Sequence, residues 1–301
     1  ATYTCIEHTC IDIASGHTFL HTEFFTDTTV IDTFRVDSLG RRTGRLYIYY
    51  GGAAPDTLPD IIITGIDSLD DFGNPVSGGE DFDGDDVPDV FVGAVQAGGY
   101  TFKNGAAYMF SGAQLALGET IPEHSFNGET IFSVFGGCAS FAGDINGDGL
   151  ADAVTGAYNW HSPAGDDTSR GKAYVIFGAR HSEDVTTLSF AGRVRFDYFA
   201  GTIAAVGDYD SDHFSDFALS ADFDTSLAAT PGTVFLYLGA HEVDTLPDYF
   251  CSGEFEGQNF GANIAPLGDV SGDSWSDFAV ATGTWAQPCK VFIYNGFARF
   301  L

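Results

Sequence analysis

The chain has 301 residues, of which 42 are acidic and 12 basic, and a net charge of −30. Nucleic acids and anionic membranes attract positive charge, so this balance excludes both as partners, and no apolar run is long enough for membrane insertion. The surplus acid is typical either of adaptation to high salt, where ions screen self-repulsion, or of an ordinary acidic secreted protein.

Residues 1–51 form a degenerate first unit, because only its last strand matches the units that follow. That strand, from Gly44 to Gly51, alternates aromatic and aliphatic residues, which predicts a half-buried β-strand. The same strand type recurs at Gly105 to Gly112, Gly171 to Gly178, Gly232 to Gly239 and Cys289 to Gly296. Five units are therefore present.

An acidic phrase recurs in the last four units, with 63, 64 and 61 residues between successive first aspartates. It reads Asp81-Phe-Asp83-Gly-Asp85, Asp144-Ile-Asn146-Gly-Asp148, Asp208-Tyr-Asp210-Ser-Asp212 and Asp269-Val-Ser271-Gly-Asp273, and it is closed by Asp89, Asp152, Asp216 and Asp277. An apolar stretch that predicts a buried strand follows each phrase. A period of this length indicates a repeat architecture.

A third strand type begins with Pro in two units, at Leu58 to Gly65 and Leu246 to Gly253. Proline suits a sheet edge, because it cannot donate to an inner ladder. With a short strand before each acidic loop, each unit has four strands, which predicts an all-β fold, a β-propeller with almost no helix. We expect a single domain, 1–301, with units at 1–51, 52–112, 113–178, 179–239 and 240–301.

The stretch from Phe72-Gly73 to Val92-Gly93-Ala94, with an acidic loop between its ends, resembles the FG-GAP repeat, the blade of the integrin α-subunit N-terminal propeller. The resemblance covers roughly residues 52–301. Integrin propellers close with seven blades, whereas five units fit here, so a five-bladed ring with a degenerate first blade is expected. Phe297 to Leu301, or a segment borrowed from Tyr3 to Ile6, would complete the fifth blade. The alternative is an incomplete ring, finished by another chain or by missing sequence.

The acidic loops offer side-chain oxygens at positions 1, 3, 5 and 9 and a backbone carbonyl at position 7, which predicts Ca²⁺ binding. The predicted ligands are Asp81, Asp83, Asp85, Val87, Asp89, Asp144, Asn146, Asp148, Leu150, Asp152, Asp208, Asp210, Asp212, Phe214, Asp216, Asp269, Ser271, Asp273, Trp275 and Asp277. Mg²⁺ prefers fewer protein ligands, and a closing acid at position 9 without flanking helices excludes an EF-hand. We expect about four structural Ca²⁺ sites, with the highest affinity in the first two loops. The alternative is that these carboxylates merely cap backbone amides in Asp-Gly turns.

Calcium sites of this kind are often weak, so we expect an extracellular or cell-surface protein, where calcium is millimolar. The chain begins without Met, and Met109 is its only methionine, which is typical of a processed, mature secreted chain.

Five cysteines are compatible with one or two disulfides in an oxidising compartment. Cys5 with Cys10 is the simplest local pair, and Cys251 with Cys289 is a second candidate, which would leave Cys138 unpaired. The alternative is that all five are reduced and buried.

The loops between second and third strands emerge on the face opposite the acidic loops, and loops on a rigid scaffold concentrate binding residues. In integrins the corresponding face is similar in meeting protein ligands. The candidate ligand-binding residues are Tyr100, Tyr158, Trp160, His161 and Trp285. Alternatively, these aromatic side chains pack over the central channel.

No catalytic constellation is found, because no metalloprotease motif, nucleophile elbow or phosphate-binding loop is present. The leading hypothesis is therefore a non-enzymatic, extracellular, calcium-stabilised adhesion module that binds a protein or glycan ligand. The second is a structural subunit of a filament, sheath or virion surface, joined by self-assembly or a partner chain at the first and last blades. The third is a carbohydrate-active enzyme.

Overall fold

The computed structural model describes residues 44–51, 57–65, 70–98, 103–162, 169–192, 198–221, 232–255, 257–283 and 289–297 with their side chains. Of the preceding residues it describes only the backbone of short strands, which are β1 (Tyr3–Ile6), β2 (Thr9–Asp12), β3 (Thr18–Leu20), β4 (Thr29–Asp32), β5 (Arg35–Val36) and β6 (Arg42–Thr43).

The N-terminal strands form two small sheets and most of a first blade. β1, β2 and β3 make one antiparallel sheet, and β5 pairs with β6. β4 pairs with β7 (Arg45–Tyr49), which pairs with β8 (Ile61–Thr64); these three strands are blade 1. Because Tyr3–Ile6 lies in the first small sheet, the expectation that it completes the fifth blade is wrong.

Four further antiparallel sheets follow, each with its strands side by side in chain order. Blade 2 is β9 (Phe72–Glu80), β10 (Asp89–Ala94), β11 (Ala106–Phe110) and β12 (His124–Asn127). Blade 3 is β13 (Phe135–Gly143), β14 (Asp152–Ala157), β15 (Lys172–Phe177) and β16 (Thr186–Ala191). Blade 4 is β17 (Ile203–Gly207), β18 (Asp216–Ala221), β19 (Thr233–Tyr237) and β20 (Tyr249–Ser252), and blade 5 is β21 (Phe260–Gly268), β22 (Asp277–Thr282) and β23 (Val291–Tyr294).

The predicted all-β propeller with almost no helix is confirmed. The described helices are α1 (Gly112–Ala116) and the 3₁₀ turn η1 (Ser182–Asp184). None of the described helices has the length and apolar character needed to cross a bilayer. The unit boundaries expected from the sequence fall between the third and fourth strands of a sheet, since β8 pairs with β7 across residues 51 and 52.

The hydrophobic core lies between blades rather than within one of them. Every residue of β10, β14 and β18 is buried, as expected for apolar strands covered on both faces. In β15, Tyr174 packs toward blade 2, whereas Val175 packs toward blade 4. Across the junction of blades 2 and 3, the rings of Phe91 and Phe141 lie 6.1 Å apart. Each of the three inner blades therefore packs on both of its neighbours.

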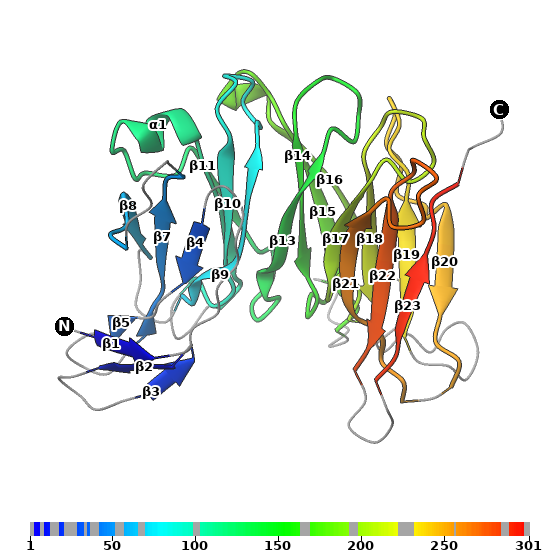
Figure 1. Cartoon of the computed structure of the whole chain (residues 1–301), viewed down its shortest axis with the longest axis horizontal. Coiled ribbons are helices and arrows are strands. Elements are labelled where there is room, and N and C mark those ends of the chain that lie inside the picture. The colour runs from blue at the N-terminus through cyan, green and yellow to red at the C-terminus, as the bar shows by residue number, and fades with distance from the viewer. Residues whose placement is uncertain are drawn as a thin grey trace.

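Blades 1 to 4 follow one another from left to right in Figure 1, and blade 5 lies beside blade 4 and overlaps it in this view. The expected closed ring is not formed by the described residues, which make an open row of five blades. Val291 and Ile293 on the free face of blade 5 are exposed, so blade 1 does not cover that face.

Candidate metal loops and the opposite surface

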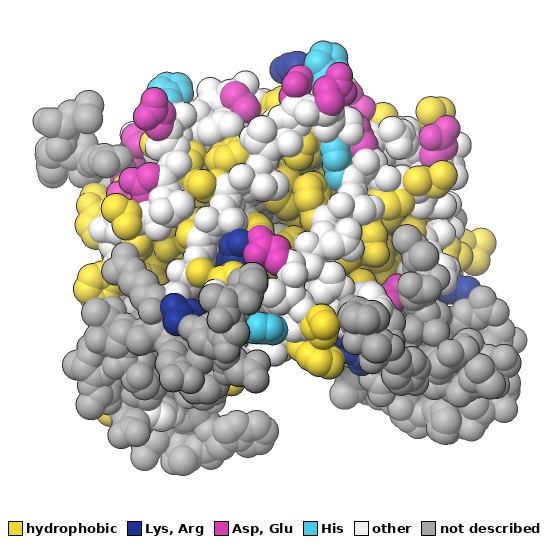
Figure 2. Space-filling model, turned by 180° about the vertical axis from the view of Figure 1, so that it is seen from behind, with side chains coloured by type: hydrophobic (Ala, Val, Ile, Leu, Met, Phe, Trp, Pro, Cys, Tyr) yellow, Lys and Arg dark blue, Asp and Glu magenta, His cyan; other side chains and the backbone are white. Residues whose placement is uncertain are grey.

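The four acidic loops connect the first and second strands of blades 2 to 5, at the end of the molecule where α1 lies (Figure 1). Acidic side chains are seen along this upper edge in Figure 2. In the first loop, Asp81 folds the chain by accepting hydrogen bonds: its Oδ1 accepts from Gly84 N at 2.6 Å and Asp85 N at 3.2 Å, and its Oδ2 from Asp86 N at 2.9 Å. Asp144, Asp208 and Asp269 accept from loop amides in the same way.

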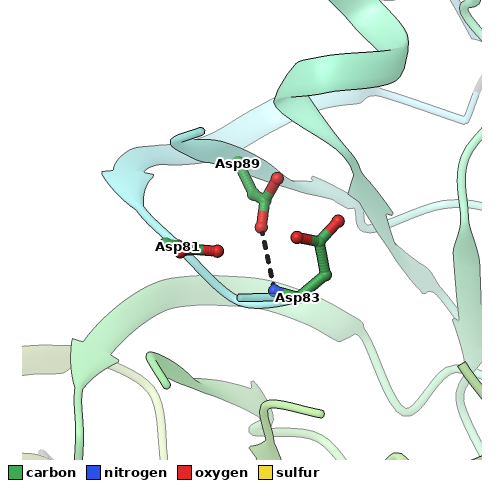
Figure 3. Close-up of side chains that lie close together, drawn as sticks. All are labelled: Asp81, Asp83 and Asp89. Carbon is green, nitrogen blue, oxygen red and sulfur yellow. Dashed lines mark hydrogen bonds between the residues drawn. The ribbon is translucent and has the colours of Figure 1, made fainter. Parts of the chain in front are cut away.

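The carboxylates of two loops converge closely enough to share one cation. Oxygen atoms of Asp81, Asp83 and Asp89 lie within 4.8 Å of one another, and so do those of Asp208, Asp210 and Asp216. Figure 3 shows the first group, with the amide of Asp83 donating to Asp89 at 3.3 Å. Three carboxylates this close repel one another, and their hard oxygens suit Ca²⁺.

The closing aspartate of each loop joins the loop to the end of the third strand. Asp216 Oδ2 accepts from Tyr209 N at 2.7 Å, and its Oδ1 accepts from Gly239 N at 2.7 Å. Asp89, Asp152 and Asp277 make the same pair of bonds, to Gly112, Gly178 and Gly296. The carboxylates therefore both cap backbone amides and lie close to one another, so the two interpretations of the sequence are compatible. The side chains that would hold a metal also fix the shape of the loop.

The second and fourth loops offer fewer carboxylates. Asn146 replaces an acid in the second loop, and its Nδ2 donates to Asp148 Oδ2 at 3.0 Å. In the fourth loop, Ser271 Oγ donates to Asp269 Oδ1 at 3.5 Å. The structure thus brings three acids together in the first and third loops, whereas the sequence favoured the first two; the order of affinities stays a prediction.

Two residues near the first loop were missed by sequence reasoning. Ser111, which caps α1, lies within hydrogen-bonding reach of Asp83, and Glu123 is close enough for Asp83 and Asp85 to raise its pKa, although burial raises it more. Neither is part of the acidic phrase. Both come from the segments after the third strand, and only the pairing of the sheet brings them to the loop.

The first three acidic loops are also held by the blade that follows. Ala151 N donates to Asp81 O at 2.9 Å, and Ser215 N donates to Asp144 O at 2.8 Å. After the third strand, Ala179 N donates to Phe82 O at 3.1 Å. The loops therefore lie at the junctions between blades, so ordering a loop also stabilises the contact with the next blade.

Burial raises the pKa of three closing aspartates, to about 6 for Asp89, about 7 for Asp152 and about 8 for Asp216, although backbone amides oppose the shift. The metal-free folded chain holds these protons to higher pH than the unfolded chain, whose ordinary value is 3.8. This stabilisation is complete below the unfolded value and is lost as pH rises through about 6 to 8. Ca²⁺ needs ionised carboxylates, so its stabilising effect should grow over the same range.

We therefore expect the difference in melting temperature between calcium and EDTA buffers to be larger near pH 8 than near pH 5. Thermal unfolding followed by circular dichroism measures this difference. Asp152→Asn should reduce the pH dependence, because it removes one titrating group, whereas Glu119→Gln, outside the loops, should leave it unchanged. An equal difference at both pH values would contradict the expectation.

The third loop contains a strained residue. Ser211 at position 4 has φ 60°, where Gly84, Gly147 and Gly272 have φ of 77°, 78° and 80°. A residue with a Cβ in the left-handed conformation destabilises the fold by about 1–2 kcal/mol, and replacing it with glycine removes this strain. Glycine also gives the unfolded chain more conformational freedom, which offsets about 0.5–1 kcal/mol of the stabilisation. Ser211→Gly should therefore raise the free energy of unfolding by about 0.5–1 kcal/mol, measured by urea denaturation in calcium.

The matched control is Gly272→Ser, at the same position of the fourth loop. An added Cβ there meets nothing within 4 Å, so only backbone strain changes. We expect a loss of similar size, and a fall in stability for Ser211→Gly would show that the hydroxyl has a role of its own.

On the face opposite the metal loops, the predicted ligand-binding residues have different environments. Trp160 is buried, and its Nε1 donates to Glu129 Oε2 at 3.1 Å beneath Lys172. This favours the alternative that its indole packs within the fold, and contact with a ligand stays a prediction. Tyr158 and His161 are partly exposed, and the Tyr158 ring lies 6.4 Å from that of Tyr198 in blade 4. The other two candidates, Tyr100 and Trp285, lie outside the described residues.

The structure adds an exposed apolar pair to this face, Ile131 and Phe132, in the connection between β12 and β13. Phe132 is 55% exposed with φ 61°. Its carbonyl accepts from Asn159 Nδ2 at 2.8 Å, and its amide donates to Lys103 O at 2.6 Å. Two bulky apolar residues in a predicted loop could have indicated an exposed apolar surface, but the sequence analysis did not consider them.

Three of the cysteines have described side chains, and all three are free thiols: Cys138, Cys251 and Cys289. The disulfide considered between Cys251 and Cys289 is therefore not formed. Burial raises the pKa of Cys138 to about 12, and its thiol donates to Ala200 O at 2.9 Å. The backbones of Cys5 and Cys10 lie opposite each other in β1 and β2, and their side chains lie outside the described part.

The FG-GAP repeat, as a sequence family, matches residues 139–176, from β13 to the end of β15. This stretch of blade 3 is thus similar to an FG-GAP repeat. The chain is 32% identical over 222 residues to integrin alpha-5 of Xenopus laevis, which covers 71% of this chain and 20% of the relative. It is 28% identical over 207 residues to integrin alpha-PS5 of Drosophila melanogaster, covering 65% of this chain and 19% of the relative.

Integrin alpha-6 of Homo sapiens matches a longer stretch, 240 residues at 26% identity, which is 79% of this chain and 19% of the relative. The chain thus spans about a fifth of the length of these curated relatives.

Proposed function

We propose that this protein is an extracellular adhesion module, stabilised by calcium, that binds a protein or glycan ligand on the face opposite the acidic loops. The observation that carries this proposal is that Ile131 and Phe132 are exposed, and Tyr158 partly exposed, on that face. Exposed aromatic and aliphatic side chains held on a rigid scaffold are typical of binding hot spots. The similarity to integrin α subunits supports both the adhesive role and the extracellular location.

Calcium has a structural role in this proposal. The converging acids belong to loops at the junctions between blades, and the face with the exposed apolar residues lies at the other end of the strands. The metal would hold the scaffold in shape, and the ligand would meet the opposite surface. We assign no catalytic role to the described residues, because their close carboxylates are those of the metal loops.

The test is binding of the protein, in calcium, to arrays of extracellular matrix proteins and glycans. For a ligand identified in this way, Phe132→Ala and Tyr158→Ala should each weaken binding at least about tenfold, as expected for hot-spot side chains. The control is Leu117→Ala, which removes an exposed apolar side chain on the metal-loop side. Binding that depends on Leu117 but not on Phe132 or Tyr158 would place the ligand on the wrong face for this proposal.

A second candidate function, a structural subunit of an extracellular assembly, is favoured by the open row of blades. Its specific support is the uncovered face of blade 5.

A further inference from the structure

The outer face of blade 5 repeats a surface that is buried in the other blades. In the third strands, Ile293 of blade 5 occupies the position of Leu236 in blade 4, because they pair with Ala279 and Ala218 in the same register. Leu236 is 4% exposed, whereas Ile293 is 59% exposed. Two residues earlier, Val234 is 1% exposed and its equivalent, Val291, is 67% exposed. These positions point toward the next blade, and blade 5 has none among the described residues.

The fourth acidic loop is also not contacted by a following blade among the described residues. At position 2 of the second and third loops, Ile145 and Tyr209 are buried and their carbonyls accept from Ala240 N and Phe297 N, residues of the following blade. The corresponding residue of the fourth loop, Val270, is 57% exposed. Two independent positions of blade 5, a strand face and a loop, thus lack the contacts that a following blade makes elsewhere.

Blade 1 carries the complementary surface. Inside the chain, the rings of Phe292 and Tyr294 pack on the aliphatic face of Val234 and Leu236 in the preceding blade. Tyr47 and Tyr49 occupy these ring positions in blade 1, as the shared pattern of the third strands indicates. They are only partly buried, and Ile62, which lies opposite Tyr47 in β8, is exposed.

We propose that the blade 5 face of one molecule binds the blade 1 face of a second copy, head to tail. The contact would continue the ring-on-aliphatic packing that joins successive blades within the chain. Within one molecule the two faces do not cover each other, because Ile293 and Ile62 are both exposed. A contact between two different surfaces leaves one free at each end, so the assembly grows into a closed ring or a filament.

The charge of the chain sets the conditions of this assembly. With a net charge of −30, copies repel one another at low ionic strength. Calcium bound in the loops lowers this charge, and salt screens the remainder, whereas burial of apolar surface does not depend on charge. Association should therefore strengthen with calcium and moderate salt. It is independent of the ligand surface proposed above.

The first experiment is sedimentation velocity across a wide range of protein concentration, in calcium and moderate salt. The average mass of the wild type should rise with concentration. Ile293→Glu should weaken association at least tenfold, because it places a charge in the apolar contact. Leu117→Glu adds the same charge to an exposed apolar site that is not among the residues proposed for either face, and should associate like the wild type. Circular dichroism melts establish that the variants fold.

A mixing experiment tests the head-to-tail arrangement. Ile62→Glu blocks the blade 1 face and Ile293→Glu blocks the blade 5 face, so each variant alone should be monomeric. An equimolar mixture should form a dimer and nothing larger, because each variant keeps one intact face that fits the other's. A monomeric wild type at all concentrations, wild-type-like association of Ile293→Glu, or a mixture without heterodimers would each overturn the proposal. A monomeric wild type would leave the face to a different blade-like partner.

Discussion

Removal of calcium should lower the melting temperature of this protein by roughly 10–20 °C. At a tenfold excess over the dissociation constant, each bound ion stabilises the folded state by about 1.4 kcal/mol, so four sites contribute about 5–6 kcal/mol. Without the ion, the carboxylates of Asp208, Asp210 and Asp216 face one another within 4.8 Å, and their repulsion acts at a junction between blades. Differential scanning calorimetry in calcium and in excess EDTA measures the effect.

A matched pair of variants separates a metal site from a general effect of charge. Asp83→Asn removes a predicted ligand of the first loop, and Asp86→Asn removes the same charge from an exposed position of that loop outside the ligand set. Calorimetric titration should show weaker calcium binding for Asp83→Asn only. An unchanged melting temperature in EDTA would refute a structural role for calcium. An equal loss of calcium affinity in both variants would mean that calcium only screens the negative charge of the loop.

Gly171→Ala should destabilise the protein by about 3 kcal/mol, because it combines backbone strain with a clash between blades. Gly171 has φ 77°, and a Cβ built on it would lie 2.1 Å from Phe199 O and 2.5 Å from Phe199 N. These are backbone atoms at the start of blade 4, bridged to Gly171, so they cannot move aside as a side chain does. The free energy of unfolding in urea measures the loss.

The control for this prediction is Gly257→Ala. Gly257 has a similar φ of 78°, and an added Cβ there meets nothing within 4 Å. It should lose only the backbone contribution, about 1–2 kcal/mol. The difference between the two variants isolates the close approach of blades 3 and 4, and equal losses would mean that this approach relaxes without penalty.

Much of the fold and of the metal loops could be predicted from the sequence because they depend on local patterns. Alternation along Lys172–Phe177 specifies a strand with two apolar faces, and position 1 of each acidic phrase specifies the loop by accepting amides from residues three to five further on. The same pattern recurs in several units, so its occurrence by chance is improbable.

The opposite surface could not be predicted in the same way, because exposure depends on neighbours that are distant in the sequence. Tryptophan in a loop is typical of a binding site, yet the indole of Trp160 is buried beneath Lys172 and donates to Glu129, which follows the outer strand of the preceding blade. Phenylalanine is typical of a core, yet Phe132 has a left-handed backbone conformation and an exposed side chain. Residue type alone does not separate these two cases.

The sequence by itself determined the β-propeller, its blades, the positions of the acidic loops and the similarity to integrin α subunits, since all of these follow from a short pattern that is repeated along the chain. Only the tertiary structure decided that the described blades form an open row, that aliphatic residues of blade 5 are uncovered, and that Trp160 is buried. The physical reason is that a blade becomes stable by burying each face against another blade. Whether Ile293 is core or surface depends on what stands beside it, and no pattern within its own strand contains that information.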